Sequence, residues 1–289
     1  MLDSVVSLRT ILLFLFFATW LPAATNRLVS TAPGLTEILF ALGLGERVVG
    51  VSEYCRFPEA ATKKPKVGSF LQPNLEVIAS LRPDVVFIQT NPVQLRQKLE
   101  RLGLRVEEVN LDSMEGILAA IPRVAEVAGV EARGKQLSQS LRKRLEDLKG
   151  LAKTGKRVAF LVGRTPGRLE GMVAVGPGSY LDALLTAAGG ENVFRDAKTM
   201  YPQISIEQLL ARQPDVILEM GDAVHDGVQD QTAQNKYREN VLAVWSRLPA
   251  LQAVKKGRIY PLTNSVYVVP GSRFVQAAEG FRKLLEGAP

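Results

Sequence analysis

The sequence predicts an α/β protein of two related lobes, each with a central parallel-type sheet, joined by one long α-helix. The first observation behind this is a repeat: Gln72 to Ile88 (QPNLEVIASLRPDVVFI) returns about 130 residues later as Gln203 to Leu218 (QISIEQLLARQPDVIL). The second is the proline-free stretch Glu131 to Lys153 between the two copies. Solenoid repeats recur every 20–50 residues or so, and this longer spacing indicates two lobes instead. Two lobes form a cleft, and clefts between domains bind ligands.

Each copy of the repeat has the same design. A capping residue, Asn74 or Ser205, begins a short amphipathic helix with a glutamate at its second position, Glu76 or Glu207. A Pro-Asp pair then ends the helix, and a β-branched run predicts a buried strand.

Short strands and helices alternate around the two copies. In the first half we expect strands at Arg27–Ser30, Val48–Val51 and Arg105–Val109, and helices at Leu35–Leu42, Leu95–Leu102 and Met114–Val127. In the second half we expect strands at Arg157–Val162 and Arg258–Pro261, helices at Ser179–Ala187 and Arg273–Leu285, and loops at Gly163–Gly178, Asp222–Asn240 (running into a helix) and Thr263–Ser272. This alternation predicts two Rossmann-like lobes with parallel sheets.

The stretch between the copies has the pattern of an amphipathic helix. Leu137, Leu141, Leu145 and Leu148 are spaced by four, four and three residues, and the other faces are charged or polar. A helix of some 20 residues is about 30 Å long, the diameter of a small domain. It could connect the lobes and limit their hinge motion, because a helix is stiffer than a Gly/Ser linker.

The N-terminus carries the apolar run Ile11 to Leu21, after Arg9 and before the small residues around Ala24. This run is short for a membrane span and is typical of a secretory signal. We therefore expect a signal peptide at 1–24, an N-terminal lobe at 25–130, the connecting helix at 131–153 and a C-terminal lobe at 154–289. An uncleaved anchor is the alternative.

Composition excludes several classes of protein. The 289 residues are 46% hydrophobic and 22% charged, with a formal charge of +7. The densest basic cluster, Arg142 to Arg144, lies beside Glu146 and Asp147 and is typical of a solvated helix face, so no nucleic-acid partner is expected.

The chain has one cysteine, Cys55, and one histidine, His225. A single cysteine forms no internal disulfide, and we interpret Cys55 as a small buried hydrophobe. One histidine argues against a zinc or manganese receptor and against an enzyme built on cysteine and histidine. We therefore expect no metal site, no catalytic residue and no intrinsic cofactor.

Several short motifs resemble one family. From about Arg27 onward, the chain is similar to the periplasmic binding proteins of ABC importers whose lobes are joined by a single long helix, and among them to those that bind cobalamin. The matching motifs are VGVSEY (Val49–Tyr54), NLE (Asn74–Glu76), RPD (Arg82–Asp84), GGENVF (Gly189–Phe194) and YPQIS (Tyr201–Ser205).

This resemblance implies a ligand held between the lobes. Cobalamin or a related corrinoid would lie against the aromatic residues Tyr54, Phe70 and Tyr201, of which Phe70 and Tyr201 each lie four residues before a helix cap. Rigid aromatic rings offer a flat macrocycle large contact area at low entropic cost. Further ligand-binding candidates are Arg273, which is kept, and Gln89 and Ser265, which stand where the resemblance implies a tryptophan and an acid. A siderophore would need clustered arginines, which Arg56, Arg164 and Arg273 could supply, so a ferric siderophore or haem stays as the alternative ligand.

The resemblance also assigns a role to the two repeat glutamates. Glu76 and Glu207 match the positions that dock onto a two-fold ABC permease at the inner membrane. A carboxylate in a first helical turn also complements the helix dipole, by about 0.3–1 kcal/mol. The expected protein is an exported, periplasmic, monomeric carrier and not an enzyme.

Overall fold

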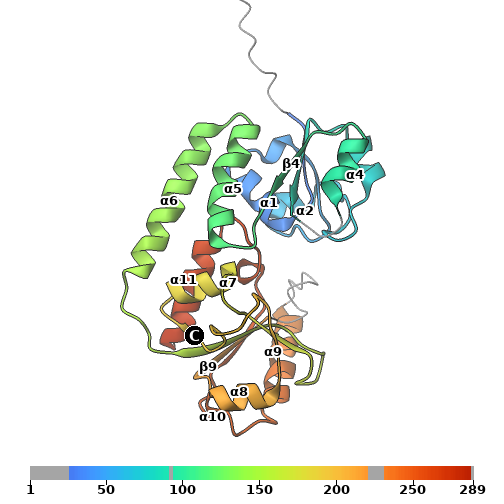
Figure 1. The fold of residues 1–289 in the computed structure, drawn as a ribbon. Coiled ribbons are helices and arrows are strands. Elements are labelled where there is room, and N and C mark those ends of the chain that lie inside the picture. Colours follow the sequence, from blue (N-terminus) through green and yellow to red (C-terminus); the bar gives the residue numbers. More distant parts are fainter. Residues whose placement is uncertain (1–25, 91–93, 221–230, 288–289) are drawn as a thin grey trace, which may run out of the picture.

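The computed structural model describes residues 26–90, 94–220 and 231–287. The predicted signal segment at 1–24 and His225 lie outside the described residues. Figure 1 shows two lobes, one above the other, with helix α6 along one side of both. The predicted two-lobed α/β fold is confirmed.

The N-terminal lobe is built on a four-stranded sheet in which all neighbours are parallel, in the order β2-β1-β3-β4. Its strands are β1 (Leu28–Ser30), β2 (Val48–Val51), β3 (Val85–Gln89) and β4 (Val106–Val109). Its helices are α1 (Pro33–Ala41), α2 (Glu59–Thr62), α3 (Leu75–Ser80), α4 (Leu95–Arg101) and α5 (Met114–Val127), with a 3-10 turn at Gly45–Arg47.

The C-terminal lobe repeats this order and adds to it. Its strands are β5 (Arg157–Gly163), β6 (Met172–Ala174), β7 (Glu191–Asn192), β8 (Gln203–Ile204), β9 (Val216–Met220) and β10 (Ile259–Leu262). Its helices are α7 (Tyr180–Ala187), α8 (Ile206–Arg212), α9 (Gln231–Trp245), α10 (Gln252–Lys255) and α11 (Phe274–Glu286), with a 3-10 turn at Ser265–Tyr267. The parallel path β7-β5-β9-β10 matches β2-β1-β3-β4 in chain order and direction.

The added strands make the second sheet mixed, where we expected a parallel one. Strand β6 runs antiparallel to β5, and β8 runs antiparallel to β6. Both lie in or beyond the Gly/Pro-rich stretch that we predicted to be a loop. Its glycines allow the chain to turn back: Gly167, Gly171 and Gly178 have positive φ angles, which side chains disfavour.

The two lobes share fine detail at the repeat. Leu28 is in register with Val85, and Val158 with Val216. Asp84 Oδ2 accepts the backbone N–H of Arg27 at 2.9 Å, and Asp215 Oδ2 accepts that of Arg157 at 3.2 Å.

The turn before each Pro-Asp pair has the same conformation in both copies. Arg82 and Gln213 occupy equivalent positions, with φ angles of 46° and 41°. Each repeat copy therefore folds as a helix, a residue in the left-handed conformation and a strand. An aspartate side chain hydrogen-bonds this unit to the first strand of its lobe.

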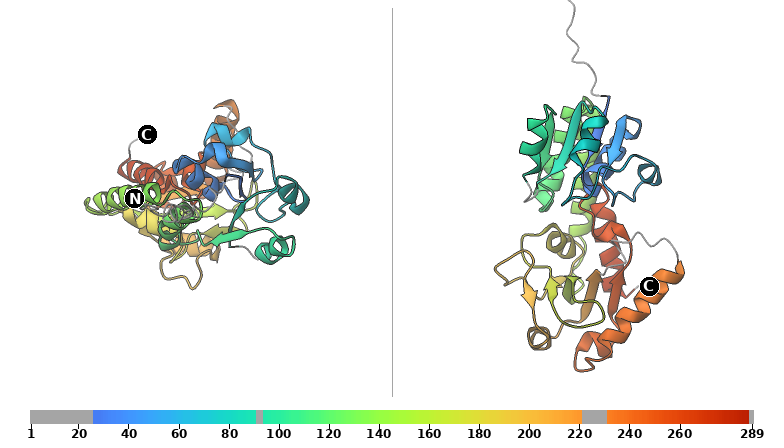
Figure 2. Two further views of the ribbon diagram at one scale, coloured as in Figure 1. Left: turned by 90° about the horizontal axis from the view of Figure 1, so that it is seen from above. Right: turned by 90° about the vertical axis from the view of Figure 1, so that its right-hand side faces the viewer.

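Helix α6 (Glu131–Lys149) connects the lobes and ends four residues before the predicted end at Lys153, with Gly150 as its C-cap. It packs closely on α5: a Cβ added at Gly134 would lie 2.3 Å from the Cβ of Ala125. The view from above in Figure 2 shows α5 and α6 side by side. Of the helices in the described ranges, none is long and apolar enough to cross a membrane.

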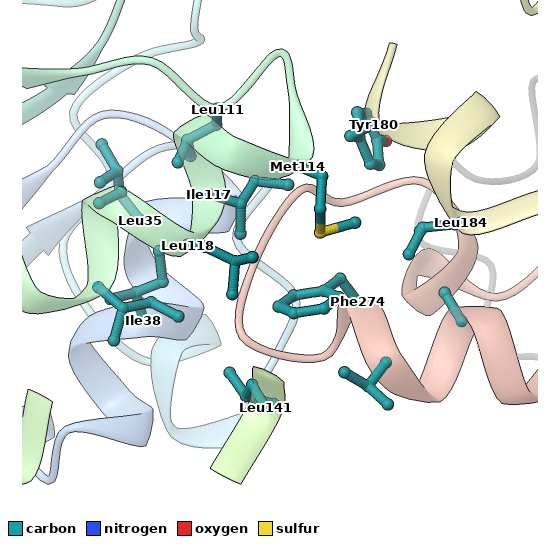
Figure 3. Close-up of a cluster of buried hydrophobic side chains, with 14 of the residues drawn as sticks. Leu35, Ile38, Leu111, Met114, Ile117, Leu118, Leu141, Tyr180, Leu184 and Phe274 are labelled. Atoms are coloured by element: carbon teal, nitrogen blue, oxygen red, sulfur yellow. The ribbon is translucent and has the colours of Figure 1, made fainter. Parts of the chain in front are cut away.

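The lobes share one hydrophobic core. We call it the junction core, and it joins side chains of α1, α5, α6, α7 and α11, as Figure 3 shows. Met114 and Phe274 lie at its centre, with Tyr180 on the side of the C-terminal lobe. Phe274 is fully buried, and Tyr180 is 6% exposed. This continuous apolar contact holds the two lobes together on the α6 side.

Candidate functional site: the face between the lobes

The carboxyl ends of the strands in both lobes point toward the other lobe. Strand β4 leads through Asp112 into α5, and the backbone oxygen of Asp112 accepts the N–H of Tyr180, the first residue of α7, at 3.0 Å. Ser272, after strand β10, donates its hydroxyl to the backbone oxygen of Glu37 at 3.2 Å. In open α/β sheets, ligands bind at the carboxyl ends of the strands. We call this region the inter-lobe face.

Tyr54 lies on this face, in the loop between β2 and α2, and is 45% exposed. The next residue, Cys55, is fully buried and holds the loop, with its sulfur 3.1 Å from Thr36 Oγ1 and 3.2 Å from Ser52 Oγ. Burial raises the pKa of the Cys55 thiol, so it stays protonated. The prediction of a buried structural cysteine is confirmed.

The two aromatic residues at matching repeat positions are in different environments. Tyr201 is 41% exposed, whereas Phe70 is partly buried and packs against the junction core. The neighbour of Phe70, Leu71, is 57% exposed instead. Partial burial raises the pKa of Tyr201, and the nearby carboxylate of Asp112, from the other lobe, adds to this. Tyr201 therefore lies close to the opposite lobe, while Phe70 offers less free ring surface.

Gln89 ends strand β3 and donates from Nε2 to Asp112 Oδ1 at 3.3 Å. We did not predict Asp112 as a site residue. The sequence signal for Asp112 was its position three residues after the end of the predicted strand Arg105–Val109, at the carboxyl edge of the sheet. The pair offers an amide and a carboxylate at the inter-lobe face.

Arg273 is held by a buried glutamate. Its Nε and Nη2 contact Glu37 Oε2 and Oε1 at 3.0 and 2.5 Å, and Nη2 also donates to Ser265 Oγ at 3.3 Å. The side chains of Arg273 and Glu37 are 12% and 3% exposed. Burial raises the pKa of Glu37, and Arg273 partly opposes this rise. The predicted site residues Ser265 and Arg273 thus belong to one network with a residue 236 positions earlier.

The C-terminal lobe has a second buried pair, at the carboxyl ends of β5 and β9. Arg164 Nη2 lies 2.8 Å from Glu219 Oε1, with side-chain exposures of 8% and 1%, and Trp245 Nε1 donates to Glu219 Oε2. Arg164 Nη1 also donates to the backbone oxygens of Thr165 and Arg168. A cavity of about 210 Å³ adjoins the pair and extends to helix α9.

The two repeat glutamates are exposed and lie in the first turns of α3 and α8. Asn74 caps α3 by accepting the N–H of Val77, and Ser205 caps α8 in a reciprocal capping box with Gln208. A hydrogen bond from the Ser205 side chain lowers the pKa of Glu207. Both carboxylates are therefore available to a partner, one on each lobe.

Phe57 is a further residue of this face that the sequence reading did not identify. It lies three residues after Tyr54 and is 43% exposed. Among the described residues, no group of three or more His, Cys, Asp or Glu could hold a metal ion.

Three comparisons give this geometry its context. Residues 28–266 match the model of the periplasmic binding protein family. The vitamin B12-binding protein of Salmonella paratyphi A is 35% identical over 215 residues, which is 73% of this chain and 78% of that protein.

Solved structures show the same fold. The periplasmic vitamin B12 binding protein BtuF of Vibrio cholerae is similar with a TM-score of 0.70 and 27% identity, over 92% of this chain and 98% of that one. The periplasmic heme-binding protein RhuT of Roseiflexus sp. RS-1 is similar with a TM-score of 0.75 and 25% identity, over 91% and 99% of the two chains.

Proposed function

The chain belongs to the periplasmic binding protein family of ABC importers, and from that premise we propose that it captures cobalamin or a related corrinoid between its lobes. The loaded protein then delivers this cargo to the permease dimer of an ABC importer in the inner membrane. In this proposal the protein is an exported, monomeric carrier of the periplasm. The corrinoid is a transported ligand and not a resident cofactor.

One observation carries the choice of ligand: two arginines near the inter-lobe face are already neutralised. Arg273 is paired with Glu37, and Arg164 with Glu219. Carboxylates and other anionic oxygens are held best by free arginine forks. Haem propionates and anionic siderophores need such groups, whereas the amide side chains of a corrinoid are neutral. Of the three arginines considered for an anionic ligand, Arg164 and Arg273 therefore already pair with carboxylates of the protein.

The exposed side chains fit the same ligand. Tyr54 and Tyr201 present half-exposed rings from opposite lobes, which suits the faces of a large flat macrocycle. Gln89 and Asp112 can hydrogen-bond to peripheral amides. Burial of apolar area would supply most of the affinity, and the polar groups would fix the orientation of the ring.

Haem is the second candidate, because Tyr54 and Tyr201 also carry phenol oxygens that could bind iron. The structural similarity to a heme-binding protein is as high as to a B12-binding protein. A ferric siderophore is the third candidate.

Calorimetric titration of the chain from Thr25 with cyanocobalamin, haemin and a ferric siderophore distinguishes these ligands. We expect one-to-one binding of cyanocobalamin alone. Binding of haemin alone, with an absorption band that the double variant Y54F/Y201F loses, would replace the corrinoid with haem. Binding of the siderophore alone would show that the neutralised arginines had been given too much weight.

The docking role of Glu76 and Glu207 is tested separately. Charge reversal in the double variant E76K/E207K should abolish ligand transfer to the reconstituted permease and leave ligand affinity unchanged, since rim charges govern docking. The matched control E115K/E191K reverses one exposed glutamate in each lobe away from the repeat helices, and it should transfer normally. Loss of ligand affinity in E76K/E207K would instead assign these residues a structural role.

A further inference from the structure

We infer that Phe57 is an additional ligand-contacting residue, and that the buried Arg273–Glu37 pair lies behind it as a positioning pair and does not itself contact the ligand. This inference rests on the proposed function, since it concerns the same inter-lobe face. It changes the role that the sequence suggested for Arg273.

The position of Phe57 is the first reason. It belongs to the loop that joins β2 to α2, at the carboxyl edge of the N-terminal sheet, three residues from Tyr54. Its ring is 43% exposed although it carries no polar atom. Single exposed apolar side chains are common on protein surfaces, so exposure by itself decides nothing.

The second reason is what lies beneath the ring. The guanidinium carbon of Arg273 is 3.8 Å from the centroid of the Phe57 ring. A cation over one face of an aromatic ring is attracted by its quadrupole and fixes its orientation. The guanidinium and the ring are therefore stacked, and only the remaining surface of the ring can meet a ligand.

The support under the guanidinium is rigid. Glu37 binds Arg273 through two oxygens, and Ser265 accepts a third contact. Gly271 packs closely against Glu37, since a Cβ added at Gly271 would lie 2.7 Å from Glu37 Oε2. Cys55 anchors the middle of the loop through Thr36 and Ser52. Loop and support together hold the ring in place before a ligand arrives, which lowers the entropic cost of binding.

This arrangement assigns Arg273 an indirect role. Its Nε and Nη2 donors are directed at Glu37 and Ser265, and the Phe57 ring covers the guanidinium. The ligand group that fits here is an apolar edge or face of a macrocycle, stacked on phenylalanine, and not an anion paired with arginine.

Cysteine footprinting tests the contact. Single cysteines are placed at Phe57, at Tyr54 and at Leu102, and the buried Cys55, which anchors the loop, is left in place. The parent protein without an added cysteine gives the labelling background. Leu102 is a 52% exposed residue after α4 and serves as the remote control. Each variant reacts with a maleimide with and without saturating cyanocobalamin. We expect at least tenfold slower labelling at positions 57 and 54 with ligand, and an unchanged rate at 102.

The outcomes separate this inference from the proposed function. Protection at 54 without protection at 57 would overturn the role of Phe57 and leave the corrinoid proposal intact. Absence of protection at both positions, with cobalamin binding measured by calorimetry, would also overturn it. If the protein binds no cobalamin, the proposed function fails, and the same labelling with haemin then decides the role of Phe57.

A double-mutant cycle tests the positioning pair. Phe57→Ala should lower cobalamin affinity about tenfold, as expected for loss of one aromatic contact. The neutral double variant E37Q/R273M should cause a similar loss, because it removes the cation beneath the ring and its two bonds to Glu37. In the Phe57→Ala background, E37Q/R273M should then cost nothing more, because the pair acts through the ring. An equal tenfold loss in both backgrounds would show that Arg273 contacts the ligand directly.

Discussion

The two lobes are two versions of one unit, and they differ mainly where they face each other. Both have the same order of parallel strands, the same aspartate holding the first strand and the same left-handed residue before it. Strand β3 is in register with β1 as β9 is with β5. The aspartates and the left-handed residues lie at the amino ends of the strands, far from the inter-lobe face.

At the carboxyl ends the copies have diverged. Ile88 of β3 is a buried apolar residue, while its counterpart in β9, Glu219, is a buried carboxylate paired with Arg164. Phe70 packs inward, and its counterpart Tyr201 is exposed. The comparison shows that the two lobes share the backbone geometry of the repeated unit, and that they differ in the side chains at the carboxyl ends of the strands and in the added strands β6 and β8.

The largest expected effect on the free energy of unfolding tests whether the two lobes unfold together as one cooperative unit. Phe87 and Leu218 hold equivalent strand positions, and both are fully buried in the junction core. Phe87→Ala should lower the free energy of unfolding by about 4 kcal/mol and Leu218→Ala by about 3 kcal/mol. Trp245 in the C-terminal lobe reports that lobe by fluorescence, and circular dichroism reports both. A denaturant transition of Trp245 that Phe87→Ala leaves unchanged would show that the lobes unfold independently.

We expect the next largest losses of stability at the two buried arginine–glutamate pairs. Arg164→Met and Arg273→Met each remove a cation from a buried carboxylate and should cost about 3 kcal/mol at pH 8. Burial holds the pKa of Glu37 above its ordinary value. Stability from this group is therefore complete below the unfolded pKa of about 4.3 and falls as the pH rises through the higher folded pKa.

Removing Arg273 should raise the pKa of Glu37 further, so Arg273→Met should be less harmful at pH 5 than at pH 8. Thermal unfolding at both pH values measures this difference. The control E37Q/R273M has no titrating group in the pair and should show no such pH dependence. An equal loss at pH 5 and pH 8 in Arg273→Met would contradict the prediction.

The aspartates at the amino ends of β3 and β9 should contribute less to stability than the buried pairs, and Asp84 should contribute more than Asp215. Asp84 accepts the backbone N–H groups of Asn26 and Arg27 at 2.7 and 2.9 Å. Among the described residues, the one backbone N–H that bonds to the Asp215 side chain is that of Arg157, at 3.2 Å. Asp84→Ala should therefore cost about 2 kcal/mol and Asp215→Ala about 1 kcal/mol. Urea denaturation measures both. The reverse order would mean that the shorter contacts contribute less than their geometry indicates.

Removing the capping side chains of α3 and α8 should give the smallest loss of stability. Asn74→Ala and Ser205→Ala should each cost about 1 kcal/mol, with the larger loss at Ser205 because its hydroxyl bonds both the Gln208 N–H and the Glu207 carboxyl, whereas the Asn74 side chain accepts one N–H. Ser205→Ala should also raise the pKa of Glu207 toward its ordinary value, since the Ser205 hydroxyl is the main cause of the lowered pKa. NMR titration of the Glu207 carboxyl tests this, and Ser205→Thr, which keeps the hydroxyl, is the control.

The sequence predicts the frame better than the site. The repeat exposed the duplicated unit because helix caps, Pro-Asp breaks and buried strands are local patterns. The pairing of Glu37 with Arg273 could not be read from the chain, since each residue alone resembles an ordinary charged helix residue and only the fold brings them together.

The same limit explains the other misses. Strands β6 and β8 are two or three residues long and carry too little periodicity to be recognised among glycines. Phe57 had no repeat partner to draw attention to it. The role of Phe70 was inferred from its matching position, but the position does not specify which neighbour, Phe70 or Leu71, turns outward.

The Arg273–Glu37 contact also affects the order in which parts of the chain can finish folding during synthesis. A ribosome makes the chain from its amino end, so the N-terminal lobe is complete long before residues 273 and 274 are added. Until then Glu37 has no guanidinium beside it, and the junction core lacks Phe274. Exposed apolar surface of this kind promotes aggregation of partly made chains. Completion of the first lobe therefore waits for Arg273 and α11, and a chain truncated before α11 should remain dependent on chaperones.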